Sequence, residues 1–190
     1  MVTMISRFMD GSASLTLAEL ERDWPTMAGH ERLDYCQSCG WLHEQTDFPD
    51  MLRFVMKRGG QEEWSAIASS IAARLPQEEA FDFLAGALQT AELSRASNIG
   101  QAIGLTKHPD AQNTLRSHLQ SVWARESLWD DDKFLNWVAY DATTCIAHLL
   151  DLGASPGDFQ EQVGKVSQHA CSGNRHSCRN FLSMHYSWLR

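Results

Sequence analysis

Hydrophobic residues recur along most of the chain three and four positions apart, which is the spacing of one face of an α-helix. The pattern is clearest from residue 61 onward, where the apolar positions are Trp64, Ile67, Ala68, Ile71, Ala72 and Leu75. Sustained alternation and clusters of β-branched residues, which would indicate strands, are missing from the sequence. The pattern therefore predicts an all-α fold of about eight to nine helices.

Local signals place the ends of these helices. Thr16, followed three residues later by Glu19, has the spacing of a capping box and opens a short helix that ends before Pro25. A helix from Phe48 should end at the Gly59-Gly60 pair. The remaining helices are expected over about 26–43, from 61 to 75, around 81–88, 99–103 and 115–122, over about 132–152, around 159–166 and over about 175–188.

Three prolines divide the chain into helix pairs. Pro76, Pro109 and Pro156 each lie between an apolar helix and its partner, 33 and 47 residues apart. The second interval is longer by about 14 residues, which places an insertion near 124–137. Two helices every ~33–40 residues are typical of an α-solenoid. The expected single domain, 1–190, comprises an irregular helical cap over 1–60, stacked helix pairs over 61–170 and a capping helix over 171–190.

One segment resembles a known repeat. Residues 99–111 read Ile-Gly-Gln-Ala-Ile-Gly-Leu-Thr-Lys-His-Pro-Asp-Ala, and Leu115 and Leu119 follow. This is similar to the inter-helix turn of HEAT-like repeats, and residues 149–156 are a looser copy; the resemblance is clearest over 98–122. It implies antiparallel helix pairs stacked as a short solenoid. HEAT-like proteins are mostly interaction scaffolds and a few carry out chemistry, so the resemblance favours protein binding and leaves an enzymatic role open.

Charge narrows the class of partner. The formal net charge is -8, and residues 59–168 contain 15 Asp and Glu against seven Lys and Arg. Nucleic acids and anionic membranes select basic surfaces, so this balance disfavours both and favours a basic protein partner. The five cysteines are an odd number, which is typical of reduced thiols in the cytoplasm. Neither a signal peptide nor an apolar run of ~18 residues is present in the sequence, so we expect a soluble cytoplasmic protein.

The insertion supplies the predicted partner-binding residues, which are Leu128, Trp129, Asp130, Asp131 and Asp132. Insertions in solenoids project from one face, and an exposed Leu and Trp beside carboxylates would suit a basic partner. Alternatively, the three Asp residues stabilise the start of the next helix, and Leu128 or Trp129 packs against it. We expect non-enzymatic protein binding, such as neutralisation of a toxin or effector. A structural homo-oligomer is a further alternative.

The second functional hypothesis is a small metal-binding protein or enzyme. Cys36, Cys39 and His43 fall at i, i+3 and i+7, on roughly one face of a helix, and would form half of a zinc site. The other ligands would come from His169, Cys171, His176 or Cys178. Alternatively, Cys36 packs in the core as a small apolar residue. Apart from this zinc alternative, no cofactor is expected.

One carboxylate stands out among apolar residues. Asp141 lies near Trp137, Val138 and Cys145 on the apolar side of its predicted helix. It would either take part in acid–base chemistry or hydrogen-bond at the rim or to the end of a neighbouring helix. The sequence contains no Ser-His-Asp spacing, P-loop or Gly-rich phosphate loop, so catalysis is not the expected function.

Overall fold

The computed structural model describes residues 16–38, 46–125 and 132–169, and within these ranges every regular element is helical. The elements, in chain order, are α2 (Leu17–Asp23), η1 (Trp24–Thr26), α3 (Gly29–Ser38), α4 (Phe48–Arg58), α5 (Gln61–Arg74), α6 (Gln77–Thr90), α7 (Leu93–Thr106), α8 (Ala111–Trp123), α10 (Asp132–Asp151), η3 (Pro156–Phe159) and α11 (Gln160–His169). The all-α prediction is confirmed. The second predicted helix begins later than expected, at Gly29, because residues 24–26 form the short η1.

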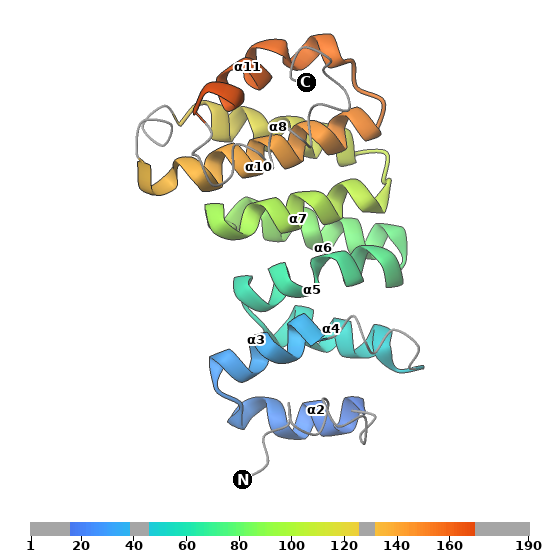
Figure 1. Ribbon diagram of the computed structural model, residues 1–190. Coiled ribbons are helices and arrows are strands. Elements are labelled where there is room, and N and C mark those ends of the chain that lie inside the picture. Colours follow the sequence, from blue (N-terminus) through green and yellow to red (C-terminus); the bar gives the residue numbers. More distant parts are fainter. Residues whose placement is uncertain (1–15, 39–45, 126–131, 170–190) are drawn as a thin grey trace.

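The helices are stacked in a row that runs from α2 to α11 (Figure 1). α3, α5, α7 and α10 pack side by side, while α6 packs on α7 and α8, and α8 packs on α10. Ser65 Oγ accepts a hydrogen bond from Asn98 Nδ2 at 3.1 Å, and Arg95 pairs with Glu62 at 2.7 Å. Residue numbers thus rise together along α5 and α7, so these two helices run in the same direction. The chain passes from one to the other through α6, which runs antiparallel to both.

The predicted end signals are present where the structure describes them. Thr16 and Glu19 form a reciprocal capping box at the start of α2. Pro76 lies between α5 and α6, and Pro109 lies between α7 and α8. Lys107 ends α7 in the left-handed conformation, with a φ of 53°.

Three consecutive helices begin at regular intervals along the chain. α5, α6 and α7 begin at residues 61, 77 and 93, and the first two both open with Gln-Glu-Glu. Gln61 Nε2 donates to the carbonyl oxygen of Thr90 at 2.7 Å, and Gln77 Nε2 donates to that of Thr106 at 2.9 Å. Each glutamine therefore satisfies a carbonyl group at the end of the following helix, where no intrahelical donor remains.

The predicted apolar stripes form the core. Buried members include Ile67, Ile71, Leu84, Ile99, Ile103, Leu115, Leu119, Val163 and Val166. α10 differs from the others, because all ten residues over 141–150 are buried. This part of α10 is enclosed on every side, which brings the polar side chains of Asp141 and His148 into the interior.

The position of Trp137 differs from the one predicted. Its side chain is exposed, although the sequence pattern placed it on the apolar face with Val138 and Cys145, both of which are buried. Successive helical residues are rotated by about 100°, so Trp137 and Val138 point in different directions, and only one of them faces the core.

The described helices lack the features of a membrane span. None of them combines the length and the apolar composition that a membrane-spanning helix needs.

Candidate functional site

The exposed apolar side chains are concentrated on two adjacent helices. In the part of the chain that the structure describes, the large hydrophobic residues that stay exposed are Leu105 (47%), Trp137 (45%) and Tyr140 (39%). Leu105 belongs to α7 and the other two belong to α10, which packs against α7. Trp137 and Tyr140 are three residues apart and so lie on one side of α10. We refer to these two residues as the aromatic pair.

The aromatic pair lies close to the predicted binding segment. Asp132 is the first residue of α10, and Trp137 follows five residues later, roughly 7.5 Å along the helix axis. Leu128, Trp129, Asp130 and Asp131 lie outside the described residues, as does the side chain of Asp132. Their role in binding therefore stays a prediction, but the end of the segment lies near exposed aromatic side chains.

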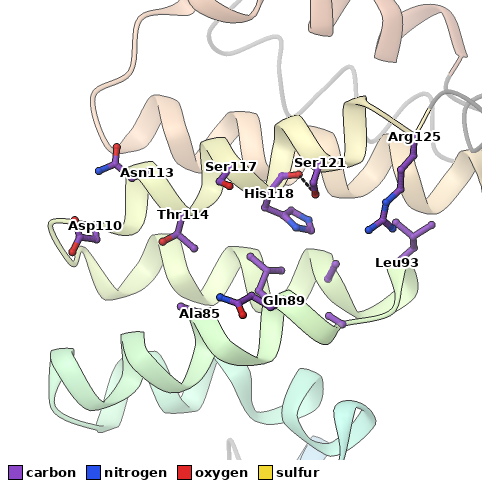
Figure 2. A pocket seen from close by; sticks show the side chains of 13 residues that line it. Ala85, Gln89, Leu93, Asp110, Asn113, Thr114, Ser117, His118, Ser121 and Arg125 are labelled. Atoms are coloured by element: carbon purple, nitrogen blue, oxygen red, sulfur yellow. Dashed lines mark hydrogen bonds between the residues drawn. The ribbon is translucent and has the colours of Figure 1, made fainter.

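A groove of about 650 Å³ lies beside α8, α6 and the start of α7 (Figure 2). Its lining residues are Ala85, Leu88, Gln89, Ala91, Leu93, Ala96, Asp110, Asn113, Thr114, Ser117, His118, Ser121 and Arg125. In Figure 2, Ser117, Ser121 and His118 project from α8, and Arg125 reaches toward Leu93 at one end. Ser121 Oγ donates to the backbone carbonyl of His118 at 2.8 Å.

His118 connects this groove to the buried interior. Its Nε2 lies 2.7 Å from Oδ2 of Asp141 on α10. The His118 side chain is 13% exposed, whereas that of Asp141 is fully buried. Asp141 therefore bonds a histidine side chain, rather than lying at the rim or bonding a helix end as the sequence suggested.

The second oxygen of Asp141 has no partner among the described residues. Oδ1 is buried and accepts no hydrogen bond from them. A buried carboxylate oxygen without a donor costs about 1–3 kcal/mol or more, because the group has lost its water and gained nothing in return. Such an atom calls for a physical explanation, and one explanation is a bound ion or ligand.

Cys145 completes a cluster with these two residues. It lies one turn after Asp141 on α10, and the ligand atoms of His118, Asp141 and Cys145 all lie within 4.8 Å of one another. Burial, together with the nearby charge of Asp141, raises the pKa of the Cys145 thiol. A raised pKa favours the protonated thiol at neutral pH, which is the opposite of what an activated cysteine nucleophile needs.

The described residues around His118 do not assemble a hydrolytic triad. Among the described residues, none offers a hydroxyl group that is hydrogen-bonded to the imidazole ring, and Ser121 is bonded to the helix backbone instead. The geometry of a base that activates a nucleophile is therefore missing from this part of the structure.

The zinc half-site predicted near the N-terminus remains untested. Cys36 is buried in α3, as the packing alternative anticipated. Cys39 and His43 lie outside the described residues, and so do Cys171, His176, Cys178 and the side chain of His169. Whether these groups meet stays a prediction.

Sequence reasoning singled out Asp141, named Cys145 only as a residue of the apolar face and missed His118. The signal was weak, since His118 is one of several polar residues around Leu119 and is 23 residues from Asp141 in the chain. Only the packing of α8 on α10 brings the three side chains together.

Comparison with known proteins gives no relative from which a function could be transferred. The chain matches no protein-family model, no curated protein and no solved structure. The HEAT-like resemblance accordingly stays a prediction, and the features of this chain that bear on function are the aromatic pair and the residues around His118.

Proposed function

We propose that this chain is a non-enzymatic protein-binding module whose partner docks on the aromatic pair. The observation that carries this proposal is the exposure of Trp137 and Tyr140, at 45% and 39%, on adjacent turns of α10. Trp and Tyr bury a large area at a small loss of side-chain entropy, and they dominate the binding energy of many protein interfaces. Their exposure on a helix whose residues 141–150 are all buried supports an interface role.

The acidic composition of the chain favours a basic partner. The chain carries a net charge of -8, and three consecutive aspartates, residues 130–132, lead into α10. An Arg or Lys side chain of the partner would gain attraction from these carboxylates and from the ring face of Trp137. Association of this kind weakens as salt concentration rises.

Within this class, we favour a partner, such as a toxin or effector, whose basic functional surface the module covers and thereby blocks. Size and charge support this choice, since a 190-residue acidic chain can cover one face of a small basic protein. The same features are compatible with regulation of another kind of basic protein.

The test is affinity capture from a lysate of the source cells, with wild type, Trp137→Ala and Leu105→Ala as immobilised proteins. Leu105 is a matched control because its exposed fraction is similar to that of Trp137, but it lies on α7, beside another part of α10. Its neighbour Gly104 packs against His148. His148 is eleven residues beyond Trp137, roughly 16 Å along α10. The captured partner is then purified and titrated against each variant.

We expect a basic protein that wild type and Leu105→Ala bind equally and that Trp137→Ala binds at least tenfold more weakly. A loss of affinity on raising the salt concentration would support the charge argument. Equal binding by Trp137→Ala, or capture of an acidic protein only, would contradict the proposal. A measurement of mass in solution tests for self-association. If wild type is a dimer and Trp137→Ala is a monomer, the aromatic pair binds a second copy of the chain instead of another protein.

A further inference from the structure

We propose that His118, Asp141 and Cys145 form a binding site for zinc between α8 and α10. The three residues supply an imidazole nitrogen, a carboxylate oxygen and a thiolate sulfur, which are the three ligand types that zinc takes in proteins. This site is separate from the zinc half-site that the sequence suggested near Cys36. It is also independent of the proposed protein-binding function.

The distances suit a tetrahedral ion. Zinc–ligand bonds of about 2.0 to 2.3 Å place the ligand atoms of a tetrahedral site roughly 3.3 to 3.7 Å apart. The three ligand atoms already lie within 4.8 Å of one another. His118 Nε2 and Asp141 Oδ2 are closer, at 2.7 Å, because a hydrogen atom joins them in the metal-free state. Replacing that hydrogen with zinc requires side-chain shifts of about an ångström.

The second, independent indication is the unsatisfied oxygen of Asp141. Oδ1 is buried without a hydrogen-bond partner among the described residues, on a side chain that is fully buried. An ion bound between the three residues would place a positive charge beside this carboxylate, in addition to the contact that Oδ2 makes with His118. Zinc with one carboxylate, one thiolate and one neutral imidazole is a neutral unit, which is the arrangement that a low-dielectric interior tolerates best.

The helices hold the ligands in a fixed relationship. Asp141 and Cys145 are four residues apart on α10 and so present their side chains on the same face. His118 comes from α8, which packs against α10. A bound ion would therefore cross-link α8 to α10 and stabilise this part of the stack.

Access comes through the groove beside α8. His118 is the member of the cluster that lines the groove, whereas Asp141 and Cys145 are fully buried. Three protein ligands leave one position of a tetrahedral ion for water or for an atom of a bound molecule. The groove is the side from which that fourth ligand would arrive.

The test uses the full chain, stripped of metal with a chelator and titrated with cobalt(II) and zinc(II). We expect about one ion per chain and, with cobalt, the charge-transfer absorption that a thiolate ligand produces. A hundredfold excess of zinc over its dissociation constant should raise the midpoint of thermal unfolding by about 5 to 10 °C. A cobalt complex without thiolate absorption, or less than about a tenth of an ion per chain, would overturn the assignment.

Variants locate the ion. His118→Gln, Asp141→Asn and Cys145→Ser should each weaken zinc binding at least tenfold, whereas Cys36→Ser, which alters a buried cysteine of another helix, should leave it unchanged. If Cys145→Ser still binds zinc and Cys36→Ser does not, the ion lies at the site near Cys36 and the proposal is refuted. If the cluster variants fail to fold, anomalous diffraction from zinc-soaked wild-type crystals locates the ion. The proposal requires the anomalous peak to lie among the three side chains, and a peak elsewhere refutes it.

Discussion

A β-carbon added to Gly104 would lie 2.7 Å from Cγ of His148, closer than unbonded carbon atoms approach one another. α7 and α10 reach their observed separation because Gly104 has no side chain at this contact. Gly100, one turn earlier on α7, faces Cys145, and a β-carbon added there would lie 3.6 Å from Sγ. The two glycines thus let α7 pack closely against Cys145 and His148 of α10.

Gly104→Ala should destabilise the protein by about 1–3 kcal/mol, because the methyl group must displace the buried imidazole of His148 or push the two helices apart. Chemical denaturation with urea measures the change. Gly86→Ala is the control, since Gly86 is a helical glycine with nothing within 4 Å of the added carbon. It should stabilise α6 by about 0.5–1 kcal/mol. Equal effects of the two substitutions would show that the Gly104 contact is not tight.

His148 should make stability depend on pH. Burial lowers the pKa of His148 below its usual value of 6.5, and Asp151 opposes this only in part. The unfolded chain therefore binds a proton more readily than the folded protein, so the contribution of His148 is fully present above about pH 6.5 and is lost as pH falls below that value. Between about pH 7.5 and 5.5, the free energy of unfolding should fall more in wild type than in His148→Gln. Parallel profiles for the two proteins would rule out this residue as the source.

His118 and Asp141 should show strong energetic coupling in metal-free protein. Removing the imidazole with His118→Leu leaves the buried carboxylate of Asp141 uncompensated, which should reduce stability by about 3–5 kcal/mol. Adding Asp141→Leu should recover a large part of that loss, because the double variant buries no charge. A double-mutant cycle measured by urea denaturation in the presence of chelator gives the coupling directly. Additive effects of the two substitutions would mean that the 2.7 Å contact contributes no net energy.

The hydrogen bonds from Gln61 and Gln77 to helix ends should each contribute to stability. Gln77→Ala leaves the carbonyl of Thr106 without its donor and should reduce stability by about 0.5–1.5 kcal/mol. Gln89→Ala is the matched control, since Gln89 is an exposed glutamine on the same helix, and its loss should change stability by less than about 0.5 kcal/mol. Thermal unfolding monitored by circular dichroism compares the two. A Gln77 variant as stable as the Gln89 variant would show that water replaces the lost donor without a net loss.

Much of the fold could be predicted from local patterns. The capping box at Thr16, the proline positions and the stripe from Ile67 to Ile71 agree with the structure, because each depends on residues within a few positions of one another. The Gln-Glu-Glu that recurs at residues 61 and 77 is also visible in the sequence. It matches the 16-residue spacing of α5 and α6, but it does not reveal that each glutamine bonds the end of the next helix.

The candidate sites depended on longer-range information. The sequence determined that α10 is a helix with a carboxylate and a thiol one turn apart, since helical period alone fixes that spacing. Only the tertiary structure decided that Asp141 faces His118, that α10 is enclosed over 141–150 and that Trp137 is exposed. The reason is physical: a helix's own residues fix which side chains share a face, whereas the burial and the partners of that face are set by helices distant in the chain.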